Sequence, residues 1–351
     1  MEVSDSDKIV CMERVRLIYE QIEEARKYIL AGSLLQLRLA LILLDNAVEL
    51  MMCRELKEDF AYHDYWRPRY QPALDEWYRA GLGPKYSDDE RRDAEKEFEP
   101  KARILQFRLN RITADERDIV CICHKMRCEA FHREHLRREI LLPVCKLLYA
   151  TAADLTVKLR FRSYVIFPPN VHNEDTAFLE RFEMRDPVLA FGSEESLNQL
   201  RRKLIDGIDS NPRELVGVLS QDLVDRIVQT VECLGYLGET DDEEKIDYNL
   251  QHTQFWREQG AELMKDGMRG ADLDRAYHEW QAQGRAKFTL YKIKRWKKRA
   301  FGIASYENPA RALVQYWAVD KRFAPLEIDV ARAVVEFDDQ INAEIHSRPL
   351  H

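Results

Sequence analysis

Residues 124 to 139, HKMRCEAFHREHLRRE, gather side chains that can transfer protons, bind phosphate or hold a metal. The run holds three of the chain's nine histidines, together with Arg127, Cys128 and Glu129. Imidazole exchanges protons near neutral pH, and a guanidinium offers a planar fork of donors to two phosphate oxygens. Three interpretations follow from these residue types: a solvated helix face, a metal site or a catalytic centre.

Geometry counts against the metal interpretation, since at most one neighbouring pair of ligands could bind the same ion. On one helix, ligands eleven residues apart are separated by about 16 Å, whereas all ligands of a zinc ion lie about 2 Å from it. The sequence also has no second cluster of cysteines and histidines to complete a site. We therefore expect neither a metal nor another cofactor, although potential ligands do recur at helical spacing: Cys121, His124, Cys128, His132 and His135.

A buried helix is predicted to position this run. Residues 34 to 52, LLQLRLALILLDNAVELMM, are apolar almost all round, yet Arg38, Asp45 and Glu49 fall on one side of the helical wheel. Charges on a buried helix need partners, because unpaired burial costs several kcal/mol. Arg127 and the histidines are candidate partners for this charged stripe.

These two segments together resemble the HEPN superfamily of helical bundles, over roughly residues 10 to 160. Many of its members are ribonucleases whose motif is an Arg, four to six further residues and a His. Arg127 and His132 match that motif with four residues between them. Asp45 and Glu49 stand where such proteins often carry an acidic or amide pair. The residue after the Arg is often Asn, Asp or His in the family, and here it is Cys128.

The resemblance implies metal-independent RNA cleavage, in which the 2′-hydroxyl attacks the adjacent phosphate and leaves a cyclic phosphate and a 5′-hydroxyl. His132 would transfer the proton, since imidazole titrates near neutral pH. Arg127 would bind the phosphate and stabilise its developing charge. Glu129 or Asp45 would orient either group. Two further histidines are substitutes for the proton role: His124 and His135.

One geometric problem concerns the motif itself. Positions five apart on an α-helix differ by about 140°, so Arg127 and His132 do not share a face. Either the helix is irregular between them or two chains contribute to each centre. HEPN proteins commonly form two-fold dimers with facing motifs, so the resemblance implies a homodimer through this domain.

Overall composition is that of a protein with a sizeable core: 351 residues, 45% hydrophobic and 33% charged. The net charge of −8 argues against a surface that binds polyanions everywhere. No secretory signal or membrane span is visible in the sequence. Seven scattered cysteines predict reduced thiols rather than a disulfide framework, so we expect a cytoplasmic protein without membrane association.

Helical periodicity dominates the sequence, so the predicted fold class is mainly α. A HEPN-like bundle over 1 to 160, with an insertion at about 60 to 110, should precede a second helical domain over 161 to 351. The boundary is placed at RFRSYVIFPPN, 160 to 170, where a Pro-Pro pair ends the helical pattern. Helix-start signals occur at Ser33, Ser193, Asn211-Pro212 and Asn308-Pro309. Helices are expected near 9 to 30, 33 to 57, 88 to 111, 115 to 133 and 135 to 160.

A basic and aromatic segment lies far from the motif. RAKFTLYKIKRWKKR, 285 to 299, interleaves lysines and arginines with Phe288, Tyr291 and Trp296. Basic groups neutralise phosphates and aromatic rings stack on bases, a combination typical of RNA contact. The alternative is a solvated amphipathic helix whose aromatic residues belong to the core. The residues expected to contact RNA are Lys292, Lys294, Arg295, Trp296, Lys297 and Lys298.

Two functions remain open from the sequence. The first is a HEPN-type endoribonuclease, similar to toxins or antiviral-defence proteins, with RNA as substrate and a regulatory protein as a further expected partner. The second is a HEPN-like module that binds or assembles without catalysis. Cleavage of RNA in the presence of EDTA distinguishes the two.

Overall fold

The computed structural model describes residues 5–66, 87–133, 138–159, 177, 180–181, 194–209 and 211–347. Within these ranges the chain is helical and contains no strand, which confirms the mainly α fold class. It divides into two compact units, Met1–Leu215 and Val216–His351. The segment 160 to 170, where the sequence places the domain boundary, lies outside the described residues.

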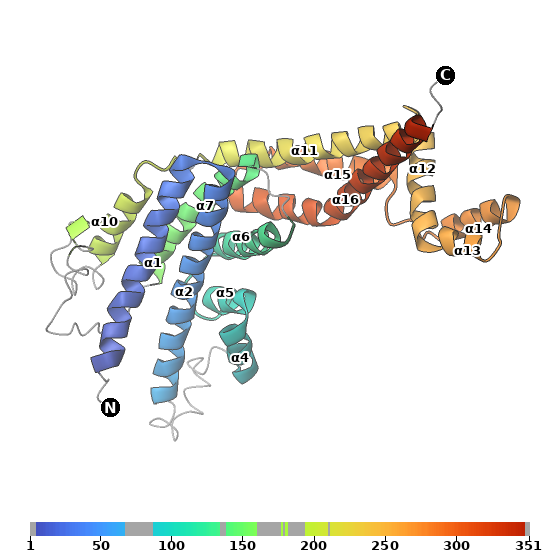
Figure 1. The fold of residues 1–351 in the computed structure, drawn as a ribbon. Helices are drawn as coiled ribbons and strands as arrows, with labels where there is room; N and C mark the ends of the chain where they lie inside the picture. The colour runs from blue at the N-terminus through green and yellow to red at the C-terminus, as the bar shows by residue number, and fades with distance from the viewer. Residues whose placement is uncertain are drawn as a thin grey trace. The chain divides into compact units, whose positions relative to one another are not determined.

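The first unit is a helical bundle built around one central helix. α1 (Asp5–Ala31) and α2 (Leu34–Trp66) pack side by side, joined by a short turn (Figure 1). α2 also contacts α5 (Phe98–Phe107), α6 (Ala114–Arg133) and α7 (Arg138–Lys158), and α7 contacts α10 (Glu194–Ile205). The apolar run of α2 is therefore buried from several sides, as its sequence predicts.

The turn between α1 and α2 confirms Ser33 as a helix cap. Gly32 adopts a positive φ of 68°, a backbone conformation that suits glycine. The Gln36 amide N–H donates to Ser33 Oγ at 3.3 Å, and the Ser33 hydroxyl donates to Gln36 Oε1 at 2.6 Å. This reciprocal cap fixes where α2 begins.

The helix expected over 88 to 111 is instead two helices, α4 (Asp88–Lys96) and α5. The break falls at Glu97, whose backbone is extended with φ −115° and ψ 147°. Pro100 explains it, since proline has no N–H to donate to the turn before it and its ring clashes with the carbonyl four residues back. The described part of the expected insertion packs into the bundle, because several of its side chains are buried: Ala94, Phe98, Ala102, Ile104 and Leu105.

α7 is the most apolar helix of the bundle. Its segment Glu139–Lys158 is long and apolar enough to cross a membrane by length and composition alone, whereas the sequence analysis predicts no membrane span. However, 67% of that window is buried against the rest of the unit. A core helix that is mostly buried can have the same length and apolar composition, so these two properties are weak evidence for a membrane span.

The second unit begins within α11 (Pro212–Leu237) and continues through α12 (Glu243–Phe255), α14 (Ala271–Ala282), α15 (Leu290–Ile303) and α16 (Pro309–Ser347). A π-helix, η2 (Trp256–Gly260), joins α12 to the short α13 (Ala261–Lys265). Phe255, Tyr277 and Trp280 form the core between α12 and α14.

Asparagine caps open the long helices of this region as predicted. The Asn211 side chain accepts from the Arg213 amide at 3.0 Å, and the Asn308 side chain accepts from the Ala310 amide at 2.8 Å. The acidic stretch 239 to 247 contains the start of α12, which Asp242 caps. Ser193 lies outside the described residues.

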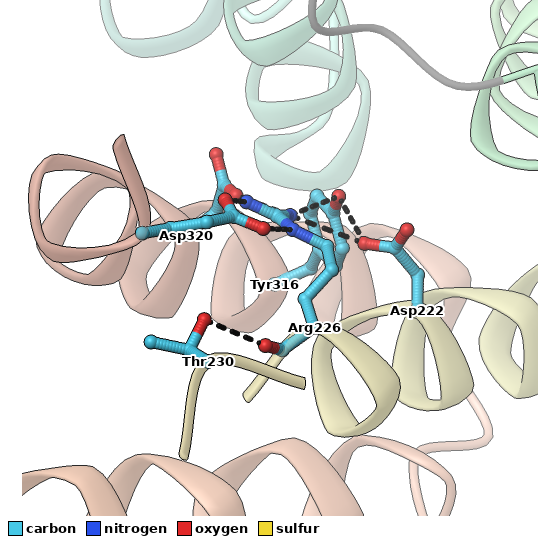
Figure 2. A network of polar contacts seen from close by, with 6 residues as sticks. Asp222, Arg226, Thr230, Tyr316 and Asp320 are labelled. Carbon is cyan, nitrogen blue, oxygen red and sulfur yellow. Dashed lines mark hydrogen bonds and ion pairs between the residues drawn. The ribbon is translucent and has the colours of Figure 1, made fainter. Parts of the chain in front are cut away.

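A buried charge network ties α11 to α16. Arg226 points from α11 toward Asp222, Tyr316 and Asp320 (Figure 2). Its guanidinium lies 2.7 Å from the Asp320 carboxylate and 2.9 Å from Glu327 Oε1. Burial raises the pKa of Asp320, which the charge of Arg226 only partly opposes. This network therefore depends on one arginine to balance several carboxylates.

Candidate functional site

The candidate site lies where α6 crosses α2. Several contacts fix the start of α6. The Glu116 amide donates to Thr113 Oγ1 at 3.2 Å, and the Thr113 amide donates to Glu116 Oε2 at 2.8 Å, which is a capping box. Lys158 of α7 binds both oxygens of the Glu116 carboxylate at 2.8 Å. The first turn of α6 is thus anchored to the last turn of α7.

Asp45 of α2 is the buried centre of the site, with only 3% of its side chain exposed. Both of its carboxylate oxygens lie 3.1 Å from His124 Nδ1. Arg127 Nε lies 3.6 Å from Asp45 Oδ2, a distance that makes an ion pair but no hydrogen bond. The predicted pairing of the charged stripe with Arg127 and a histidine is confirmed for Asp45.

His124 has contacts at one face of its ring and at both ring nitrogens. Its ring stacks on Phe98 of α5, with 4.0 Å between ring centroids and 12° between ring planes. Its second nitrogen, Nε2, lies 3.9 Å from Cys128 Sγ, and Arg127 Nη1 lies 3.9 Å from the same sulfur. His124, Arg127 and Cys128 share one face of α6 because they stand three and four residues apart.

Glu49 has a different partner. Its carboxylate binds Lys101 of α5 at 3.0 Å, and the Lys101 side chain is 3% exposed. A second acid of α2, the buried Glu55, pairs with Arg111 at 3.1 Å. Of the predicted acidic pair, Asp45 contacts Arg127, and Glu49 contacts Lys101 instead.

The motif histidine is described by its backbone alone. α6 is a continuous α-helix from Ala114 to Arg133, so the irregular helix that would bring Arg127 and His132 onto one face is not found. The two positions point about 140° apart. The side chain of His132, and His135 as a whole, lie outside the described residues. Glu129 is half-buried on the same helix.

Comparison with known proteins gave no relatives. No family model, curated protein or solved structure matches the chain.

Sequence reasoning ranked His124 only as a substitute, yet it is the histidine that the structure places against Asp45. The signal was its position three residues before Arg127, on the same helix face. Phe98 and Lys101 were missed, because they come from α5 and no periodic pattern links that helix to the motif. Among the described residues, no group of three or more His, Cys, Asp or Glu side chains is arranged to hold a metal ion.

The basic segment of the second unit forms the amphipathic helix α15. Thr289 caps it by accepting a hydrogen bond from the Lys292 amide at 3.3 Å. Its inner face consists of buried residues that stand three and four apart: Leu290, Ile293, Trp296, Ala300 and Ile303. Its outer face carries most of the basic side chains, with Tyr291 70% exposed among them.

One predicted RNA contact needs correction. Trp296 is buried and packs edge-on against Phe288 and Phe323, with ring centroids 6.2 Å and 6.0 Å away. Trp296 lies on the apolar side of the helix, three residues after Ile293. Its ring therefore packs in the core and does not stack on bases. Two aromatic residues of α15 are exposed: Phe301, and Tyr291, whose ring centroid lies 5.9 Å from the Arg295 guanidinium.

The lysines of α15 differ in their contacts. Lys292 Nζ donates to the Lys287 carbonyl at 2.8 Å, and Lys294 pairs with Glu243. Lys298 is exposed, and Lys297 is half-buried. The outer face of α15 is therefore a local cationic surface on an acidic protein.

Proposed function

We propose that this protein is a metal-independent endoribonuclease of HEPN type, with Arg127 as the phosphate-binding group and His132 as the proton-transfer group. The observation that carries the proposal is the buried Asp45, which pairs with Arg127 across two helices at the motif. A guanidinium held before substrate arrives stabilises phosphate charge without reorganisation. The Arg127 side chain is 36% exposed, so it is anchored at one end and solvent-accessible.

A two-chain centre follows from the regular helix. Since α6 is unbroken between Arg127 and His132, the two positions lie on different faces of the helix. A two-fold dimer in which α6 faces its copy would bring Arg127 of one chain to His132 of the other. The proposal therefore includes a homodimer through the first unit.

The outer face of α15 supports RNA as the substrate. Lysines and arginines there neutralise phosphates, and Tyr291 offers an exposed ring. The residues proposed to contact phosphates are Lys292, Lys294, Arg295, Lys297 and Lys298. A toxin-like or antiviral role, and a regulatory protein partner, extend the proposal, because unrestrained RNA cleavage would harm the cell that makes it.

The direct test is cleavage of RNA in EDTA, with detection of cyclic phosphate and 5′-hydroxyl ends. Arg127→Ala and His132→Ala should each lower cleavage at least a hundredfold, since each removes a group that acts on the transition state. Arg103→Ala is the matched control, because Arg103 is an exposed arginine of α5. Near wild-type cleavage by a folded Arg127→Ala variant would refute the assignment.

Mixing two inactive variants tests the dimer. If Arg127 of one chain works with His132 of its partner, a dimer of one Arg127→Ala chain and one His132→Ala chain has one intact centre. Co-expression at equal levels makes about half of the dimers mixed, each with one of its two centres intact, so about a quarter of the wild-type activity should return. Absence of any recovery, in mixed dimers shown to form, would assign each centre to a single chain.

A second candidate is a HEPN-like module that binds RNA without cleaving it. It is favoured by the contacts of Asp45, which also serve to hold α6 against α2. Such a protein would retard RNA in a gel without shortening it. Replacing Arg295 and Lys298 with Gln should flatten the salt dependence of that binding, since each lost phosphate contact removes about one released counterion.

A further inference from the structure

The proposed ribonuclease chemistry does not use the thiol of Cys128, although this thiol lies beside groups of the candidate site. Its sulfur lies 3.9 Å from His124 Nε2, and His124 Nδ1 lies 3.1 Å from the Asp45 carboxylate. A thiol, an imidazole and a buried carboxylate therefore stand in line. Arg127 Nη1, 3.9 Å from the same sulfur, adds a permanent positive charge.

The order of these groups sets the direction of proton transfer. When Nδ1–H donates to the carboxylate, the neutral ring presents Nε2 as an acceptor toward the thiol. The imidazolium formed by taking the thiol proton is stabilised by Asp45. The thiolate left behind lies between two cations, His124 and Arg127, which is the type of environment that makes cysteines reactive. Phe98 keeps the imidazole ring from turning away.

Other described cysteines have surroundings of the opposite kind. Cys123 and Cys145 are buried, and burial raises the pKa of each thiol. Cys53 and Cys233 are half-buried like Cys128, and burial raises the pKa of both. Cys53 and Cys233 thus provide controls of similar exposure within the same chain.

We propose that Cys128 is a reactive thiol, activated by His124 and Asp45 and oxidised by hydroperoxides. The thiolate attacks one oxygen of hydrogen peroxide, so that an S–O bond forms and the O–O bond breaks. Sulfur loses two electrons and becomes sulfenic acid, and the peroxide is reduced. The departing hydroxide takes the proton that His124 received from the thiol and leaves as water.

This site goes beyond the proposed ribonuclease and is tested without RNA. The full-length reduced protein is treated briefly with iodoacetamide at neutral pH, and labelling of each cysteine is followed by peptide mass spectrometry. Cys128 should react at least about fivefold faster than Cys53 and Cys233. Equal or slower labelling of Cys128 would overturn the proposal.

Two variants separate activation from exposure. Asp45→Asn and His124→Gln should each slow labelling of Cys128 at least about threefold while leaving Cys53 and Cys233 unchanged. Because Cys53 and Cys233 report on unfolding, a general rise in labelling identifies a misfolded variant, and the other variant then decides. Fast labelling of Cys128 that survives in a folded variant of each kind would show that exposure alone explains it.

Peroxide provides the final measurement. Wild-type protein treated with hydrogen peroxide and then with a carbon nucleophile selective for sulfenic acid should carry the adduct at Cys128 before Cys53 or Cys233. A Cys128→Ser variant should carry none at that position and keep its fold, because serine preserves size and polarity. Adducts that form first at Cys53 or Cys233 would contradict the assignment.

Discussion

Loss of Arg226 should destabilise the second unit more than loss of any exposed arginine. The side chain is 11% exposed and binds three carboxylates, at 3.2 Å to Asp222, 2.7 Å to Asp320 and 2.9 Å to Glu327. Burial would lower the pKa of Arg226, but the hydrogen bond to Glu327 and the surrounding negative charge hold it above its ordinary value. Arg226→Met keeps much of the volume and removes the only positive group that these contacts show.

The expected magnitude follows from the charges left behind. Removing one partner of a buried ion pair costs about 3 to 5 kcal/mol. For a unit of about 140 residues, that loss lowers the melting temperature by about 10 to 17 °C, given about 2 cal/mol/K of unfolding entropy per residue. Lower pH should reduce the loss of melting temperature, because the carboxylates left without Arg226 then bind protons.

Scanning calorimetry of the full-length protein measures the effect. Arg332→Met is the matched control, since Arg332 is an exposed arginine of α16. Adding Asp320→Asn and Glu327→Gln to Arg226→Met should restore part of the stability by removing the unbalanced charges. A difference of less than about 3 °C between the two methionine variants would mean that water already screens the network, and the reasoning would be wrong.

Three smaller changes complete the predictions. Thr113→Ala should lower the free energy of unfolding by about 1 kcal/mol, measured in urea, because it removes the cap of α6; an unchanged value would mean that Glu116 and Lys158 hold the helix start alone. Because burial raises the pKa of Asp320 above 3.8, the Asp320 carboxyl binds a proton more tightly in the folded state than in the unfolded chain. The contribution of Asp320 to stability therefore falls as the pH rises above 3.8. Asp320→Asn should therefore flatten the pH dependence of unfolding above pH 3.8, and identical profiles of the two proteins would refute this. Gly260→Ala should cost about 1 to 3 kcal/mol in the same urea assay, since a Cβ there would lie 2.9 Å from the Trp256 ring, and full stability would show that the ring moves aside freely.

Many helices could be predicted because long apolar patterns and local capping signals set them. The start of α2 at Ser33 and the caps at Asn211 and Asn308 follow from local hydrogen bonding, which sequence encodes directly. The break between α4 and α5 was missed although Pro100 was visible, because proline also occurs within first turns without ending a helix.

The site was partly predictable for the same reason. A charge on a buried helix needs a partner, and that rule identified Asp45 and the α6 run as neighbours. It could not assign each partner. Glu49 pairs with Lys101, and Trp296 packs in the core against Phe323. Packing between helices far apart in sequence decides such contacts. Helical phase could have ranked His124 above the later histidines, since it shares a face with Arg127.

The π-helix at Trp256–Gly260 has a consequence for how the second unit could change over time. A π turn holds one residue more than an α turn, so it amounts to a single-residue insertion in an otherwise α-helical segment. Deleting one codon there would return the segment to α geometry and leave every later side chain of α13 close to its present orientation, because the π turn already absorbs the extra residue. A one-residue deletion at η2 should therefore leave the direction of α13 nearly unchanged, whereas the same deletion within the regular helix α12 would rotate every later side chain by about 100° about the helix axis.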